Sequence, residues 1–349
     1  MIRNVIEQKT AAVFPRRMLC RSAFDRTPAG WVICAVISVL LALAPGFGAA
    51  GEEPAVYPGK LGIAKAKNLT PQEREVEGRF AKYLEERTDE AIARYRSKYG
   101  KEINTDNARE LSLDYAPGGL EADDADTRAA RSKWSAAVHE PSSALTKEIY
   151  RRELRKPAAR DERNQVIFTA GGAGVGKTSS IHQVPGLGHA VDAAQIVYDT
   201  TLSGLKSSLE RISQALDAGK AVSIVYVYRD PVDSLVGGAL PRAERNGRTL
   251  PLEAFLETHL GAPEVLLKIA EMYKSDKRVE IAVIDNSGSR GKAALADLKF
   301  VQAVGRKYTR EELRAKLLRA LEDAYEKGKR GEKEGISERV YRAFKGPAA

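Results

Sequence analysis

The stretch that decides the fold runs from Gln165 to Thr178 and reads Gln-Val-Ile-Phe-Thr-Ala-Gly-Gly-Ala-Gly-Val-Gly-Lys-Thr. Its first five residues are mostly β-branched or aromatic, which predicts a short buried strand. Gly171, Gly176, Lys177 and Thr178 then fit the phosphate-binding pattern G-x-x-x-x-G-K-[ST]. We expect a helix to begin at Lys177, so the chain offers the strand, loop and helix that this pattern requires.

Each residue type in this loop has a mechanical reason to be there. Glycines let backbone N–H groups turn inward around an anion, and a helix beginning at Lys177 adds the positive end of its dipole. The Lys177 ammonium can reach the β- and γ-phosphates, and the Thr178 hydroxyl can ligate Mg²⁺. The sequence therefore predicts ATP and Mg²⁺ as cofactors. The predicted nucleotide-binding residues are Gly171, Gly172, Ala173, Gly174, Val175, Gly176, Lys177, Thr178 and Ser179.

Strands and helices alternate along the chain after this loop. Apolar runs predict strands at 194–198, 221–228 and 279–284, and we expect an edge strand at 298–304. This alternation predicts an α/β fold, a three-layer P-loop sandwich with a mostly parallel sheet and flanking N- and C-terminal helices.

Two capping boxes mark the beginnings of those flanking helices. Residues 70–73 (Thr-Pro-Gln-Glu) predict a helix that continues to Tyr99, where Gly100 ends it. Residues 309–312 (Thr-Arg-Glu-Glu) predict a second one near the C-terminus. The charged tail from Lys327 is expected to be loosely held.

The first 50 residues have a different composition from the rest. Residues 31–44 are almost wholly apolar, arginines precede them, and small residues end the segment at Ala50. This pattern predicts a secretory signal cleaved near Ala50, or an uncleaved anchor, so we expect an exported or inner-membrane-anchored protein. Both cysteines, Cys20 and Cys34, lie in this segment, so a cleaved chain would have no disulfide and no thiolate metal site.

The charge of the chain gives little support to nucleic-acid binding. The net charge is +9 over 349 residues, and acidic and basic residues are mixed along the sequence. An ordinary solvated surface explains this balance, so no specific nucleic acid is expected as a partner. Membrane contact is expected only through residues 31–50, if they are not cleaved.

A phosphate loop by itself predicts a bound nucleotide but no reaction. If the protein is a kinase, it also needs a base for the attacking hydroxyl and cations for the transferring phosphoryl group. Asp199 ends the strand that follows the loop, where it could orient substrate or hold a Mg²⁺-bound water, or simply cap a turn. Arg242 and Arg248 flank a basic, glycine-containing loop predicted at 242–249. Such a loop is suited to close over phosphates, although arginines in loops are often only solvated.

Short motifs lie on both sides of the phosphate loop. Residues 103–107 (Ile-Asn-Thr-Asp-Asn) and 138–143 (Val-His-Glu-Pro-Ser-Ser) precede it, and 198–201 (Tyr-Asp-Thr-Thr) and 247–251 (Gly-Arg-Thr-Leu-Pro) follow it. With these motifs, and with 285–287 (Asp-Asn-Ser) at the end of a late strand, the chain resembles the zeta toxin family. In that family the phosphate-loop strand comes first and the equivalents of the first two motifs follow it. The resemblance, over roughly residues 102 to 290, therefore implies a circularly permuted domain.

The resemblance implies a kinase that transfers the γ-phosphate of ATP to a sugar nucleotide. Members of the family typically phosphorylate UDP-N-acetylglucosamine, and an antitoxin or immunity protein is an implied partner. Asp106 would be the general base for a sugar 3′-hydroxyl, with Lys177, Arg242 and Arg248 at the phosphates and Thr178 at Mg²⁺. The implied substrate-binding residues are His139, Glu148, Asp199 and Thr201.

Simpler roles stay open for three of these residues. Asp106 could cap a helix, His139 could be a packed side chain, and Glu148 could be a solvated helix-surface partner of a basic residue. The implied division is a signal or anchor (1–50), a linker and helix (51–100), the kinase domain (101–305) and a C-terminal helix and tail (306–349).

Two other functions also stay open. One is a P-loop kinase of another substrate, such as a nucleic-acid end or a small metabolite. The other is a non-catalytic ATP-binding module of an export or conjugation assembly. The export signal conflicts with cytoplasmic ATP chemistry, and the sequence does not resolve that conflict.

Overall fold

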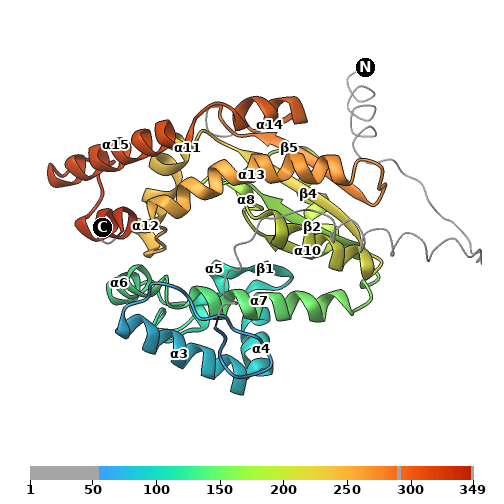
Figure 1. Ribbon diagram of the computed structural model, residues 1–349, viewed down its shortest axis with the longest axis horizontal. Coiled ribbons are helices and arrows are strands. Elements are labelled where there is room, and N and C mark those ends of the chain that lie inside the picture. Colours follow the sequence, from blue (N-terminus) through green and yellow to red (C-terminus); the bar gives the residue numbers. More distant parts are fainter. Residues whose placement is uncertain (1–54, 289–291, 347–349) are drawn as a thin grey trace, which may run out of the picture. The chain divides into compact units, whose positions relative to one another are not determined.

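A six-stranded sheet lies at the centre of the computed structural model, which describes residues 55–288 and 292–346 (Figure 1). The strand order is β1-β3-β2-β4-β5-β6. The first five strands are parallel, and β6 pairs antiparallel with β5. The α/β fold with a mostly parallel sheet is therefore confirmed. The strands are β1 (Glu102–Asn104), β2 (Arg163–Ala170), β3 (Ala194–Asp199), β4 (Ala221–Tyr228), β5 (Val279–Asp285) and β6 (Ala294–Ala296).

Helices surround this sheet. Those before the phosphate loop are α3 (Pro71–Glu86), α4 (Thr88–Tyr99), α5 (Thr105–Ala108), the 3₁₀ helix η2 (Arg109–Leu111), α6 (Ala125–Trp134) and α7 (His139–Leu154). Those after it are α8 (Lys177–Ile181), α9 (Leu187–Ala193), α10 (Leu205–Asp217), α11 (Pro231–Ser234), the π-helix η3 (Leu235–Ala239), α12 (Leu240–Asn246), α13 (Leu252–Met272), α14 (Leu298–Gly305), α15 (Arg310–Lys329) and α16 (Glu338–Lys345).

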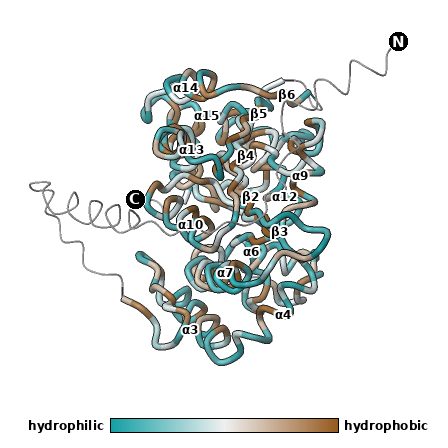
Figure 2. The backbone as a smooth tube through the Cα atoms, turned by 90° about the vertical axis from the view of Figure 1, so that its right-hand side faces the viewer, coloured by the Kyte–Doolittle hydropathy of each residue, from teal (hydrophilic) through white to brown (hydrophobic). Residues whose placement is uncertain are grey.

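The central strands are buried on both faces, as their continuous apolar runs predict. Val166 and Phe168 of β2 and Ile224 of β4 have no exposed surface. The ring of Phe168 packs against those of Tyr150 and Tyr198. Figure 2 shows the same division, with hydrophobic residues on the central strands and many hydrophilic ones on the helices around them.

The register of three strands brings polar side chains to one edge of the sheet. Asn104 at the end of β1 pairs with Asp199 at the end of β3, and Thr169 of β2 pairs with the same residue. Because parallel strands end at the same edge, the segment before the phosphate loop and the loop itself meet there.

The capping box at Thr70 forms as predicted, but the helix is shorter than expected. The Thr70 hydroxyl accepts from the Glu73 N–H, and the Glu73 carboxylate accepts from the Thr70 N–H. The chain then leaves helical geometry at Arg87 (φ −129°, ψ 38°), so two helices replace the predicted single one. Both contribute to the core, through Val76 and Tyr95 among others.

The predicted edge strand at 298–304 is wrong, because these residues form helix α14. Asp297 caps it by accepting from the Phe300 N–H at 2.9 Å. Val301 is buried while the lysine two residues before it is exposed, so the apolar run covers one side of a helix. The true edge strand is β6, which lies just before it.

The predicted basic loop at 242–249 is also partly wrong. Residues up to Asn246 form α12, so Arg242 lies on a helix and only Arg248 lies in a loop. Pro241 in the first turn and Gly247 at the C-terminal end (φ 74°) are the residues that helix ends favour. Arg242 is therefore held by a helix whose Ala243 is fully buried.

The C-terminal tail is not loosely held. The second capping box, at Thr309, begins α15 as predicted, and the chain then returns as α16. Val340 and Phe344 of α16 have no exposed surface, and α16 packs on α15, α6 and α12. Its charged residues alternate with these two apolar anchors at helical spacing, which explains why composition alone predicted a solvated tail.

By its internal contacts the chain from Ala55 onward forms one compact unit. The predicted boundaries near residues 100 and 305 stay predictions. No helix in the described part of the chain is both long and apolar enough to cross a bilayer. The predicted signal or anchor segment lies outside the described residues.

We expect Phe344→Ala to destabilise the protein by about 3–5 kcal/mol, because it removes a fully buried ring that fixes α16. Leu113→Ala is the control, since Leu113 is 66% exposed, and should cost less than about 0.5 kcal/mol. Urea unfolding followed by circular dichroism measures both. Equal midpoints for Phe344→Ala and the wild type would contradict the packing of α16.

Candidate functional site

A cavity of about 2090 Å³ opens at the edge of the sheet where β1, β2 and β3 end. The phosphate loop, the β1–α5 junction, the start of α7, the end of β3 and α12 all contribute to its lining. Ligand pockets usually measure about 300–1,000 Å³. The cavity therefore has room for a nucleotide and a second substrate together.

The phosphate loop adopts a backbone conformation that strongly favours glycine. Gly174 (φ 77°) and Gly176 (φ 81°) are left-handed, and Gly176 is the N-cap of α8. A Cβ on Gly174 would lie 2.5 Å from the Ser234 carbonyl oxygen. The loop is thus packed tightly against neighbouring backbone. The N–H groups of the first turn of α8 have no partner within the helix, as an anion site requires.

Two side chains of α13 hold the loop in place. The Ala173 N–H donates to Thr258 Oγ1 at 3.1 Å, and His259 Nε2 lies 2.9 Å from the Ala173 carbonyl oxygen. Burial lowers the pKa of His259 to about 4, so its imidazole is neutral at pH 7 and Nε2–H can donate to that carbonyl. Sequence reasoning missed both residues, because α13 carries no motif that links it to the loop.

Lys177 is paired at the strand ends. Its Nζ lies 2.8 Å from Asp199 Oδ1 and donates to the Thr200 carbonyl oxygen at 2.7 Å. Asn104 Nδ2 donates to the other Asp199 oxygen at 2.6 Å, and the Thr169 hydroxyl also donates to this carboxylate. Asp199 is therefore the counterion of the loop lysine and connects it to β1.

Asp106 lines the cavity and does not cap a helix. Asn104 is the cap of α5, and its Oδ1 accepts from the Asp106 N–H at 2.8 Å. Desolvation raises the pKa of the Asp106 carboxyl, but the charges of Arg109, Arg242 and Arg248 outweigh it and hold the pKa well below its usual range. The carboxylate is thus ionised and can accept a hydrogen bond from a substrate hydroxyl.

Arg109 links Asp106 to His139, and sequence reasoning missed it. Its Nη2 lies 3.3 Å from Asp106 Oδ1 and 2.9 Å from His139 Nδ1, and Nη1 donates to Ser135 Oγ at 2.8 Å. Burial and the Arg109 charge lower the pKa of His139 to about 4, so the imidazole is neutral at pH 7 and Nδ1 accepts from Arg109 Nη2. The only signal in the sequence was the spacing of Arg109, three residues after Asp106.

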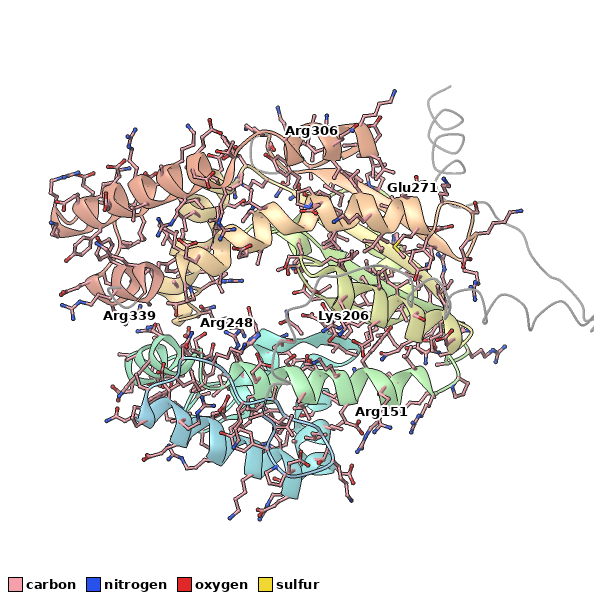
Figure 3. The ribbon with its side chains drawn as sticks, viewed as in Figure 1. Arg151, Lys206, Arg248, Glu271, Arg306 and Arg339 are labelled. Carbon is pink, nitrogen blue, oxygen red and sulfur yellow. The ribbon has the colours of Figure 1, made fainter. Side chains whose placement is uncertain are left out.

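The two predicted arginines are held differently. Arg248 donates to Glu110 and, at 3.2 Å, to Asn107 Oδ1, so it is tied to the β1–α5–η2 segment (Figure 3). Glu110 is only 4% exposed and also accepts from the Tyr99 hydroxyl at 2.7 Å. Arg242 lines the cavity without a hydrogen bond or ion pair to any residue that the structure describes. Its charge is available to a ligand.

Thr178 and Thr201 line the cavity, but Glu148 does not. Glu148 pairs with Arg152 at 2.7 Å and with Arg151, a residue of α7 that points away from the sheet in Figure 3. The predicted substrate role of Glu148 is therefore corrected: its place on α7 gives it basic partners of the same helix instead. Thr201 Oγ1 lies 2.9 Å from Ser203 Oγ at the cavity wall.

No group of three or more histidine, cysteine or acidic side chains that could hold a metal occurs among residues 55–288 and 292–346. A Mg²⁺ ion at substrate phosphates generally takes only one or two ligands from the protein. Thr178, at the second position of α8, is the side chain placed to supply one.

The fold and the loop define an α/β protein with the P-loop kinase fold. Residues 187–293 match the zeta toxin family model, which covers the chain from α9 to just beyond β5. Members of that family are kinases, so the matched domain implies P-loop kinase activity with ATP. A search of curated proteins found no match.

We expect Glu148→Gln to leave the KM for the phosphate acceptor unchanged, because the side chain lies outside the cavity. Loss of its partly exposed ion pairs should cost at most about 1 kcal/mol of stability. Steady-state kinetics with varied acceptor measures the KM. A raised KM with an unchanged kcat would show that Glu148 does contact the acceptor.

His259 should make the protein less stable in acid. Its pKa is about 4 when folded, against an ordinary value of 6.5, so the unfolded chain binds the proton first as the pH falls. The contribution of the neutral His259 imidazole to the free energy of unfolding is constant above pH 6.5 and falls between pH 6.5 and 4. At pH 5 this contribution is lower by about 2 kcal/mol. In His259→Gln the loss of unfolding free energy from pH 7 to pH 5 should be smaller by that amount.

Denaturant unfolding at the two pH values measures this effect. His189→Gln is the matched control, because His189 is an exposed residue of α9, and its pH dependence should equal that of the wild type. An equal pH dependence in His259→Gln would contradict a buried neutral imidazole.

Proposed function

We propose that this protein transfers the γ-phosphate of ATP to a hydroxyl group of a sugar nucleotide such as UDP-N-acetylglucosamine. The observation that carries the proposal is the position of Asp106. Its carboxylate and the phosphate-loop residues Lys177 and Thr178 line one cavity, although they come from segments far apart in the sequence. A base beside a phosphate loop is the arrangement that a kinase needs.

The charge of the cavity supports two polyphosphate ligands. Basic side chains on its lining clearly outnumber acidic ones, and guanidinium groups suit phosphate oxygens. The basic residues are Lys67, Arg109, Lys133, Lys177, Arg211, Arg229, Arg242, Arg245, Arg248, Lys333 and Arg342. The acidic ones are Glu73, Asp106, Asp199 and Glu334.

Each residue then has a role in the transfer. Asp106 accepts the hydrogen bond of the attacking hydroxyl and orients it. Its low basicity is sufficient because phosphoryl transfer passes through a loose transition state in most analyses, in which a strong base is not required early. Lys177 and Arg242 stabilise charge on the transferred group, and Arg248, fixed by Glu110, keeps the base segment in place. Thr178 and the substrate phosphates would hold Mg²⁺, which supplies further neutralising charge.

The circular permutation has its own structural support. Lys101 Nζ donates to the carbonyl oxygens of Asp192 and Ala194, at the junction between α9 and β3. Gln195 Nε2 donates to the carbonyl oxygens of Lys156 and Pro157, at the other end of the same segment. These contacts support the proposal that residues 101–157 occupy the place, before β3, where the family order would insert this segment.

The family match fits the same explanation. It begins at residue 187, after the phosphate loop, and continues through β3, β4 and β5. A family model in which the base segment lies between the loop and β3 can match this chain only after the phosphate loop. An antitoxin partner, which the family implies, is also part of the proposal, and we assign no binding surface to it.

We expect Lys177→Ala to lose ATP binding and phosphate transfer together. Asp106→Asn should keep ATP binding and lower kcat by about 10²- to 10⁴-fold, because it removes only the base. Transfer from γ-labelled ATP to a panel of UDP-sugars, oligonucleotides and small metabolites measures both effects and the acceptor. Asp323→Asn, on the exposed surface of α15, is the control and should match the wild type.

Three results would contradict the proposal. Full activity of Asp106→Asn would show that Asp106 is not the base. Transfer only to oligonucleotides or metabolites would show that the acceptor is not a sugar nucleotide. ATP binding without any turnover would support a non-catalytic module.

A further inference from the structure

Arg229 enters the cavity beside the phosphate loop, and neither the loop pattern nor the family motifs assign it a role. It directly follows β4, the neighbour of β2 on the side away from β3. Ala170, the last residue of β2, pairs with Tyr226 of β4. The two chains therefore leave the sheet at the same edge, one as the phosphate loop and the other at Arg229, and both line the cavity.

Gly237 makes room for the Arg229 guanidinium. A Cβ built on Gly237 would lie 2.7 Å from Arg229 Nη2 and 3.4 Å from its Cζ. Gly237 belongs to the π-helix η3, and π-helical turns are frequent at functional sites. The guanidinium thus lies against a backbone surface that has no side chain.

The same π-helix is fitted onto the phosphate loop. A Cβ on Gly238 would lie 2.3 Å from the Gly174 carbonyl oxygen, so these two glycines are in direct backbone contact. The neighbouring glycines of η3 therefore do two things: Gly238 packs on the loop and Gly237 holds the guanidinium beside it. Both glycines line the cavity.

Arg229 is not committed to a protein partner, unlike three other cations of the cavity lining. Lys177 pairs with Asp199, Arg248 with Glu110, and Arg109 with Asp106. The Arg229 side chain has no hydrogen bond or ion pair to another residue within the described part of the chain. A charged fork held beside an anion loop, with its donors free, is prepared for phosphate oxygens.

We propose that Arg229 binds the β- and γ-phosphates of the nucleotide donor, and that Gly237 is glycine so that the guanidinium can occupy this position. The proposal rests on the proposed function, because it requires a nucleoside triphosphate in the phosphate loop. It adds to Arg242 a further phosphate-binding arginine, which directly follows β4 and does not come from α12.

Nucleotide affinities of four proteins test this proposal: the wild type, Arg229→Ala, Gly237→Ala and the double variant. Titration calorimetry with ATP and with AMP, both with Mg²⁺, gives the Kd values. Each single variant should weaken ATP binding by about tenfold or more, since a charge-assisted hydrogen bond is lost. AMP binding should stay unchanged, because AMP lacks the two phosphates.

Gly237→Ala is the sharper variant. Its Cβ would meet only the far end of the Arg229 side chain, so it should displace the guanidinium while the protein stays folded. In the Arg229→Ala background, Gly237→Ala should then have no further effect, because its target is gone. Arg306→Ala, an exposed residue outside the cavity that Figure 3 labels, is the control and should bind ATP as the wild type does.

Three outcomes overturn the proposal: an unchanged Kd for ATP in Arg229→Ala, equal losses for ATP and AMP, or fully additive effects of the two substitutions. ATP binding by the wild type distinguishes a failure of this inference from a failure of the proposed function. A wild type that binds no ATP refutes both, whereas ATP binding that is insensitive to Arg229 refutes only the new inference.

Discussion

The ion pair between Lys177 and Asp199 connects the two halves of the site. The lysine belongs to the phosphate loop, and the carboxylate that holds it also accepts from Asn104, two residues before Asp106. The position of the loop cation and the position of the segment that carries Asp106 are therefore linked through one side chain. This link depends on β1 lying next to β3 in parallel register, which places Asn104 opposite Asp199.

The arginines around Asp106 explain how its carboxylate stays ionised in the cavity. Desolvation alone would favour its protonated form, and the nearby guanidinium groups reverse that preference. Arg109 is itself fixed by His139 and Ser135, so the proposed base is oriented by a buried network and not by a mobile loop.

Local signals in the sequence predicted the part of the structure that depends on local chemistry. The glycine pattern predicted the phosphate loop, and capping residues predicted the starts of α3 and α15. Periodicity was ambiguous for residues 298–304, where a short apolar run served a helix and not a strand. The same lack of tertiary information made α16 look like a solvated tail and made Arg242 look like a loop residue.

The candidate site was predictable only where a motif marked it. Asp106 and His139 lie at the cavity as the motifs indicated, whereas Glu148, placed by analogy alone, lies outside it. Arg109, His259 and Arg229 were missed because their roles come from contacts between distant segments. No spacing in the chain shows that His259 bonds to Ala173 or that Gly237 lies under Arg229.

A crystal structure with Mg²⁺ and a non-hydrolysable ATP analogue tests the central claim most directly. The account predicts that the γ-phosphate lies in the cavity between the Lys177 ammonium and the Asp106 carboxylate, with Arg242 in contact with it. The opposite result is a nucleotide whose phosphates point away from Asp106, or a loop that binds no nucleotide. Either would show that the two halves of the site do not act on one substrate.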